Sequence, residues 1–231
     1  DKWLIAINKP AGTYVDATPW DATTHLRTAL ADVLAHEDYF PPLHPAHRLD
    51  RDTTGVLLFT HHPHANASLQ KIFVQQRAQK FYLCHVHGHP DWDDYTCLSG
   101  HGRSDRGRFR VYPLDQVGQP LPNGDTIKQM HTQLQVLRRN PDGTSFVLAI
   151  PHTGRTHQIR LHVHACGLPI VGDKSYGRSD DGVIAHRLHA WQLHIPHPIH
   201  ETPLYIHAPL PDWIPVDLAL PVLHDTIEGI E

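Results

Sequence analysis

The stretch that decides the fold is HRLDRDTTG at residues 47–55, followed at once by the apolar run VLLF at residues 56–59. A charged loop that runs into a buried strand holds polar side chains on a rigid edge, where catalytic groups are easily kept in register. The same composition also fits a salt-bridged turn on the surface, which is the commoner role of a charge cluster. The local sequence therefore allows two interpretations, a catalytic loop and a surface turn.

The rest of the chain alternates short apolar runs with turn residues, which favours an α+β fold. The turn sequence RRNPDG at residues 138–143 lies between two strand-like runs and predicts a β-hairpin. Residues 91–124 are rich in Gly, Asp, Arg and Pro and predict a loop or hairpin insertion. The expected strands are 3–7, 55–59, 81–86, 130–137, 145–150, 186–195 and 203–208, and the expected helices are 24–36, 65–77 and a helix within 152–167 that ends at Gly167.

Composition indicates a globular chain with a real core, because 40% of the 231 residues are hydrophobic and 19% are charged. No window approaches the roughly 18 apolar residues of a membrane span, and no stretch has the basic start and small-residue cleavage site of a signal peptide, so we expect no membrane partner and a cytoplasmic location. The three cysteines, at positions 84, 97 and 166, form no CxxC pair. Their odd number and wide spacing indicate a reducing compartment.

The formal net charge of −4 does not suggest a polyanion-binding protein, but the distribution of charge matters more than the sum. Arginines gather at positions 103, 106, 108 and 110, which permits a basic face. The 23 histidines are spread over the whole length without an HExxH frame. Compositional bias therefore explains them better than a metal site, and we expect no metal.

Five ordered segments are NKPAG at 8–12, HRLDRDTTG at 47–55, KFY at 80–82, HTGRTHQIRLHVHACGLPIVGD at 152–173, and LHAW at 188–191 leading to His197-Pro198. Together they resemble the RluA family of RNA pseudouridine synthases. The resemblance spans about residues 3–208, and it implies a single α+β domain with a mixed, mostly antiparallel sheet, flanking helices and a central RNA-binding cleft. We expect this catalytic domain at residues 1–210, followed by a C-terminal tail at 211–231 without an assigned role.

Motif positions assign roles to individual residues. The resemblance implies that Asp50 is the nucleophile, Tyr82 the active-site tyrosine and Arg160 the basic partner that keeps Asp50 ionised. It also implies that Arg48 fills the space that a flipped base leaves. The expected RNA contacts are Arg48, Lys9, Arg155, His157, Arg103 and Arg106.

The implied activity is the isomerisation of specific uridines to pseudouridine in structured RNA, either tRNA or large-subunit rRNA. One carboxylate that forms a covalent intermediate suffices for this chemistry, so we expect no cofactor and no obligate protein partner. Two alternatives come from other classes. One is a catalytically silent RNA-binding module, and the other is a histidine-dependent metallohydrolase.

Overall fold

A computed structural model describes residues 1–18, 25–35, 43–104, 108–178 and 181–223. The central feature is a ten-stranded sheet in the order β1-β3-β9-β4-β8-β7-β5-β6, with β10 paired to β9 and β2 to β3. The strands are β1 (Leu4–Lys9), β2 (His44–Pro45), β3 (Thr54–Thr60), β4 (Gln79–His87), β5 (Asp94–Arg103), β6 (Phe109–Tyr112), β7 (Lys128–Arg139), β8 (Thr144–Pro151), β9 (Leu188–Pro196) and β10 (Pro203–His207). The helices are α1 (Leu26–Leu34), α2 (Pro63–Val74), the short 3₁₀ helix η1 (Leu114–Gln116) and α3 (Gln158–Ala165).

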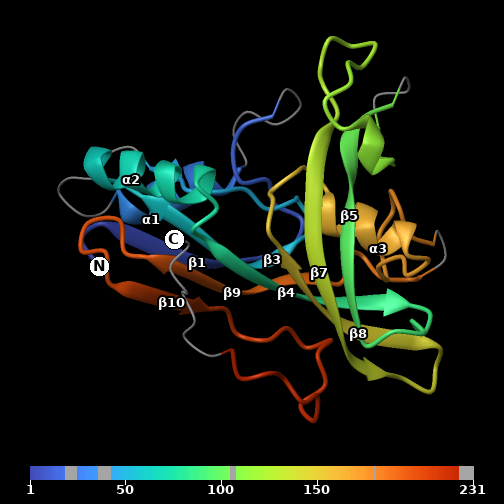
Figure 1. Ribbon diagram of the computed structural model, residues 1–231. Coiled ribbons are helices and arrows are strands. Elements are labelled where there is room, and N and C mark those ends of the chain that lie inside the picture. Colours follow the sequence, from blue (N-terminus) through green and yellow to red (C-terminus); the bar gives the residue numbers. More distant parts are fainter. Residues whose placement is uncertain (19–24, 36–42, 105–107, 179–180, 224–231) are drawn as a thin grey trace.

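The sheet is mixed, because β3 and β9 run parallel while every other strand pair in the described residues is antiparallel. In Figure 1 it curves so strongly that β5 and β7 stand across the direction of β1, β3 and β9, with α3 beside them. The expected α+β class and the mostly antiparallel mixed sheet are confirmed. No helix of the described residues is long and apolar enough to cross a membrane.

The run VLLF on β3 is continuously apolar because both faces of the strand are covered. Leu57 and Phe59 belong to the core cluster that α3 completes with Ile159 and Val163. Val56 and Leu58 point to the opposite face and pack with α2. Successive side chains on a strand alternate between faces, so a strand with two covered faces needs apolar residues at every position.

Residues 211–223 cover the remaining part of the second face. Ile214 and Leu218 are buried against Phe81 on β4 and Phe146 on β8, in one cluster with Trp191 of β9. The C-terminal segment, which had no assigned role, therefore packs against β4, the strand that carries Tyr82.

The hairpin turn between β7 and β8 forms as expected. Gly143 adopts a φ of +81°, and its N–H donates to the carbonyl of Asn140. Asp142 Oδ1 accepts the Thr144 N–H at 3.0 Å, the local contact for which aspartate is favoured in turns.

Residues 91–124 contain more regular structure than a loop. The strand β5 pairs with β7 from Asp94 to His101, and β5 and β6 form a hairpin at the edge of the sheet. This strand is hard to predict from the sequence because two of its positions, Gly100 and Gly102, are glycines, which are uncommon in strands. A Cβ at either position would meet the side chain of Ile127 or Leu121 within 2.6 Å, so these neighbours fill the space instead.

The third helix is shorter than expected. It begins at Gln158 instead of near His152, because His157 takes a left-handed backbone with φ of +58° at the N-cap. It ends at Ala165, and Gly167 follows with φ of +76°, which agrees with the expected end at Gly167.

Gly55 lies where the loop at residues 46–53 leads into β3, directly against β9. Its φ is +109°, and a Cβ there would lie 2.1 Å from the carbonyl oxygen of Ala190. We expect Gly55→Ala to lower the free energy of unfolding by more than about 1 kcal/mol, since the chain pays for both backbone strain and a backbone clash. Urea unfolding followed by circular dichroism measures this change.

Gly118→Ala is the matched control for that substitution. Gly118 has a comparable φ of +90°, but no atom lies within 4 Å of its ideal Cβ. The control keeps the strain without the clash, so equal losses in the two variants would contradict the role of the Ala190 contact.

Candidate active site

Asp50 lies in the loop between β2 and β3. The main chain of this loop is held by hydrogen bonds from Lys9, the last residue of β1. The Thr53 N–H donates to the Asp50 carbonyl at 3.1 Å and closes the turn. Lys9 Nζ donates to the carbonyls of Arg51 at 2.8 Å and Thr53 at 3.0 Å, and also to that of Pro10 at 2.8 Å. The end of β1 thus holds the loop through its main chain.

This placement corrects the expectation that Lys9 contacts RNA. Its side chain is 0% exposed, and its three ammonium hydrogens are matched by three backbone carbonyls. Burial lowers the pKa of Lys9 to about 8, against the charges of Asp52 and Asp50, which raise it. Lys9 therefore supports the loop and does not reach a ligand.

The expected pairing of Asp50 with Arg160 is confirmed. Arg160 Nη1 on α3 donates to Asp50 Oδ2 at 2.9 Å, although the two residues are 110 positions apart. The Arg160 side chain is 7% exposed and that of Asp50 24%. A buried guanidinium beside a partly open carboxylate favours the ionised form of that carboxylate.

Asp173 is a second carboxylate on Arg160, and sequence reasoning missed it. Arg160 Nε donates to Asp173 Oδ2 at 2.7 Å, and Nη2 donates to Oδ1 at 2.8 Å. Burial raises the pKa of Asp173, but the hydrogen bond and charge of Arg160 and two backbone N–H groups outweigh burial and bring it down to about 2. The only sequence signal was its place at the end of the quoted segment 152–173, where Gly172-Asp173 looked like an ordinary turn.

Tyr82 lies on β4 in the same core cluster as Ile159 of α3. Its side chain is buried, and burial together with the nearby charge of Asp50 raises the pKa of its hydroxyl above the usual range. The Tyr82 hydroxyl therefore remains protonated at neutral pH. It can donate a hydrogen bond or a proton beside Asp50, while its ring presents an aromatic face.

His157 and Tyr176 connect Asp50 to the β5–β6 hairpin. His157 Nε2 lies 4.0 Å from Asp50 Oδ1, and His157 Nδ1 is hydrogen-bonded to the Tyr176 hydroxyl at 2.9 Å. Burial lowers the pKa of His157, and the Asp50 charge opposes that effect. The Tyr176 hydroxyl also donates to the carbonyl of Phe109 on β6 at 3.3 Å, so the hairpin forms one wall of the site.

Three of the other expected RNA contacts are exposed arginines. Arg48 is exposed two positions before Asp50, and Arg155 is exposed at the start of the α3 segment, where its Nε donates to the Gln129 carbonyl at 3.2 Å. Arg103 is exposed on β5, with its guanidinium 4.5 Å from the centre of the Phe109 ring. Arg106 lies outside the described residues.

The histidines are mostly hydrogen-bonding partners inside the protein. His186 Nε2 lies 2.8 Å from Thr53 Oγ1, and His189 Nδ1 lies 2.8 Å from Thr54 Oγ1, so both join the Asp50 loop and the start of β3 to the β9 side of the sheet. Across the described ranges, no three His, Cys, Asp or Glu side chains are grouped in a way that could hold a metal ion.

Three buried histidines, His162 on α3 together with His186 and His189, make the stability of the fold depend on pH. Burial lowers the pKa of His162, His186 and His189 from 6.5 to about 4. The unfolded chain takes up protons below pH 6.5, whereas the folded chain resists until about pH 4, so stability falls as the pH drops through this window. We expect the free energy of unfolding to be at least about 2 kcal/mol lower at pH 5 than at pH 7.5, the effect of one such histidine.

Urea unfolding across this pH range measures the loss. His162→Gln should flatten the pH dependence by about one proton, because its ring no longer titrates between the two states. The exposed residue His64 provides the control, because His64→Gln removes an imidazole that is not buried. A stability curve that is flat from pH 7.5 to pH 5 would contradict this account.

Comparisons with known proteins agree with this geometry. The sequence profile of the RNA pseudouridylate synthase family matches residues 3–165. RNA pseudouridine synthase 1 of Oryza sativa subsp. japonica is 36% identical over 258 residues, which cover 92% of this chain and 72% of that protein. The dual-specificity RNA pseudouridine synthase RluA of Yersinia pestis is 32% identical, covering 89% of this chain and 94% of that protein.

A solved structure shows the same fold. Human RNA Pseudouridylate Synthase Domain Containing 1 superposes with a TM-score of 0.72 at 28% identity, covering 91% of this chain and 81% of that one.

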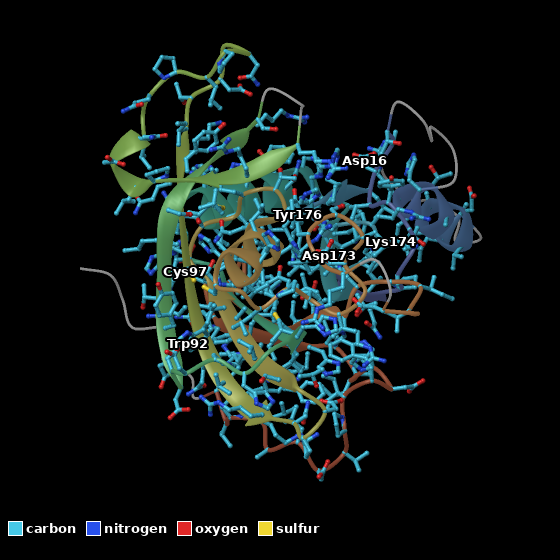
Figure 2. All side chains as sticks on the ribbon, turned by 90° about the vertical axis from the view of Figure 1, so that its right-hand side faces the viewer. Asp16, Trp92, Cys97, Asp173, Lys174 and Tyr176 are labelled. Carbon is cyan, nitrogen blue, oxygen red and sulfur yellow. The ribbon has the colours of Figure 1, made fainter. Side chains whose placement is uncertain are left out.

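In Figure 2, Asp173 and Tyr176 lie near the middle of the molecule, between the β5–β6 hairpin and the N-terminal part. The family match, the fold and the Asp50–Arg160 pair lead to one conclusion: the chain belongs to the RNA pseudouridylate synthase family and is an RluA-type enzyme.

Proposed function

We propose that this pseudouridine synthase modifies specific uridines in tRNA, in large-subunit rRNA, or in both, with Asp50 as its nucleophile. The observation that carries the role of Asp50 is the 2.9 Å pair with Arg160 on a carboxylate that remains partly open to solvent. The names of relatives support the substrate class. The Yersinia pestis relative is called dual-specificity, and a Vibrio cholerae relative at 33% identity is a ribosomal large subunit pseudouridine synthase.

The reaction moves atoms within one nucleoside. An Asp50 oxygen attacks C1′ of uridine, the C1′–N1 bond breaks, and its electron pair stays on the uracil ring. The uracil then turns, C5 attacks C1′, and the ester to Asp50 breaks and returns the carboxylate. Finally the proton on C5 is lost and N1 takes up a proton, so no oxidant, metal or added group is consumed.

Arg160 and Tyr82 have distinct parts in this sequence. Arg160 keeps Asp50 ionised before attack, since an adjacent guanidinium favours the charged carboxylate. Tyr82 offers its ring to the uracil and a hydroxyl that relays the C5 proton, accepting it while releasing its own proton. Support comes from their common surroundings: both residues are buried, and the charge of Asp50 acts on both.

The target base must leave the RNA stack to reach Asp50, at a cost of a few kcal/mol. We propose that Arg48 fills the vacated space, because it is exposed next to the nucleophile and a planar guanidinium stacks well on bases. We place the RNA in a central cleft between the Asp50 loop and the β5–β6 hairpin, where Arg103 and Arg155 are exposed. Arg106 and His157 complete the set of proposed contacts.

We propose that the enzyme needs neither cofactor nor obligate protein partner, as the balanced isomerisation indicates. We also propose a reducing compartment such as the cytoplasm, and the three free cysteines support this location. Purified protein should therefore modify a target transcript without additions and in the presence of a chelator.

The decisive experiment is pseudouridine mapping of tRNA and large-subunit rRNA from cells with and without this gene. Complementation with the wild-type gene should restore every lost site, and complementation with Asp50→Asn should restore none. If no site depends on the gene, the proposed substrates are wrong. If Asp50→Asn restores the sites, the proposed nucleophile is wrong.

Arg103 provides a separate test of the RNA path. We expect Arg103→Gln to weaken RNA binding and to reduce the slope of log K against log salt by about 0.7 to 0.9, the value for one lost phosphate contact. Fluorescence anisotropy with a labelled target RNA at several salt concentrations measures the slope.

Arg77→Gln is the matched control for charge. Arg77 is exposed and pairs with Glu201 at 3.3 Å, beyond the end of α2. The control removes the same charge from another part of the surface, so it should leave the slope unchanged. An identical slope change in both variants would show that net charge alone, and not a contact at Arg103, governs RNA affinity.

A further inference from the structure

The guanidinium of Arg160 is shared unequally between its two carboxylates. Asp173 takes the whole Nε–Nη2 edge through two hydrogen bonds of 2.7 and 2.8 Å. Asp50 receives a single hydrogen bond from Nη1 at 2.9 Å. A bidentate pair is stronger and geometrically stricter than a single bond, so the orientation of Arg160 is set by Asp173 and not by Asp50.

Asp173 is itself rigid. Its side chain is 1% exposed, and Oδ1 accepts two further hydrogen bonds, from the N–H groups of Ser175 at 2.9 Å and Tyr176 at 3.1 Å. Its carbonyl accepts the Gly177 N–H at 2.7 Å. In Figure 2, Asp173 lies close to Tyr176 near the middle of the view. The carboxylate is therefore held by its own turn, independently of Arg160.

The charges of this triad change during the proposed reaction. Before attack, one guanidinium faces two carboxylates. Once Asp50 is bonded to C1′, its negative charge is gone and has moved to the uracil. Arg160 remains buried and positive, and Asp173 then neutralises it. Without Asp173, the attack would strand an unpaired buried cation, which is strongly unfavourable.

We infer that Asp173 is a positioning residue for this reaction, a permanent counter-ion that fixes Arg160 and leaves the charge of Asp50 available for attack on C1′. The inference rests on the proposed function of Asp50. Asp173 touches neither substrate nor reacting atoms and acts only through Arg160. The fold supplies it from a segment after α3, so the nucleophile, its partner and the counter-ion come from three separate parts of the chain.

The test compares Asp173→Asn with the wild type in single-turnover reactions at saturating enzyme over a range of pH. Asparagine keeps the volume and one oxygen for the Ser175 and Tyr176 N–H groups but removes the charge. We expect RNA affinity within about twofold, and a rate constant for chemistry about 10- to 100-fold lower, as when a group that orients a reacting residue is removed. The acid limb of the rate profile should move to lower pH, because the undivided charge of Arg160 then acts on Asp50.

The direction of that movement separates positioning from structural damage. A loosened site would let Arg160 move away from Asp50, and the acid limb would stay in place or move to higher pH. The other titratable and charged groups near the two carboxylates are present in both enzymes: His157, His186, Tyr176, Tyr82, Lys9, Asp52, Arg51, Arg103 and Arg108. The Asp173 charge also acts on His157, His186 and Tyr176, and Asp173→Glu is the variant that keeps this charge.

Asp181→Asn is the matched control. Asp181 Oδ2 accepts the Gly172 N–H beside Asp173, and its Oδ1 pairs with His87, both at 2.6 Å, without contact to Arg160. It should perturb the same turn and leave the acid limb in place. If Asp173→Asn does not fold, Asp173→Glu carries the test: it keeps the charge, so its acid limb must stay at the wild-type pH, and a shifted limb overturns the inference.

The inference and the proposed function fail in different ways. If Asp50→Asn is inactive while Asp173→Asn keeps the wild-type rate and acid limb, Asp173 is not a positioning residue and the nucleophile stands. If Asp50→Asn is as active as the wild type, the proposed function of Asp50 is wrong and the inference falls with it.

Discussion

Asp50→Asn is expected to lower pseudouridine formation by at least about 10³-fold, because an amide cannot replace an ionised carboxylate as nucleophile. The substitution keeps the shape of the side chain and an oxygen for the Arg160 Nη1 hydrogen bond. RNA affinity and the unfolding midpoint should therefore remain close to those of the wild type. A single-turnover assay with a target transcript measures the rate, and anisotropy measures the affinity.

Asp52→Asn is the control that the chain itself offers. Asp52 lies two residues further along the same loop, but its contact is with the exposed Arg51 at 3.6 Å. Exposed ion pairs contribute little, so this variant should keep its activity within about threefold. If the two variants lost activity equally, the loop would depend on total charge, and Asp50 would have no special role.

Arg160→Leu is expected to abolish activity and to lower the free energy of unfolding by about 3–5 kcal/mol, the cost of leaving a buried charge without its partner. The charge left behind is that of Asp173, which is 1% exposed. Urea unfolding and the single-turnover assay measure the two effects on one preparation.

The double variant Arg160→Leu with Asp173→Leu separates those effects. Removing the stranded carboxylate should recover much of the lost stability, since apolar residues often replace a buried ion pair at little cost. Activity should stay absent, because nothing then keeps Asp50 ionised and oriented. A single variant as stable as the wild type would show that Asp173 finds another partner.

The two carboxylates within residues 47–55 have different partners, so the two local interpretations of this stretch apply to different side chains. Arg51 and Asp52 form the surface ion pair that charge clusters usually form. Asp50 turns inward to Arg160 instead. Local composition cannot separate adjacent carboxylates, because their roles depend on a residue 110 positions away.

Patterns that depend on near neighbours were predictable. The apolar run of β3 and the turn of the β7–β8 hairpin follow from strand burial and turn chemistry within a few residues. Lys9 and Asp173 were not predictable in the same way. A lysine in a turn is usually exposed and an aspartate after glycine usually solvated, and only tertiary contacts show that both are buried.

The hydrogen bonds from Lys9 to the Asp50 loop also affect which substitutions the loop can accept. Lys9 donates hydrogen bonds to the main-chain carbonyls at positions 51 and 53, and every amino acid has such a carbonyl. The amino acid at position 51 can therefore differ without moving Asp50. No other side chain brings three hydrogen-bond donors to one buried point on a single nitrogen, so Lys9 cannot be replaced in the same way. Lys9 on β1 should therefore determine how many substitutions this loop tolerates, although it is more than 40 positions away in the chain.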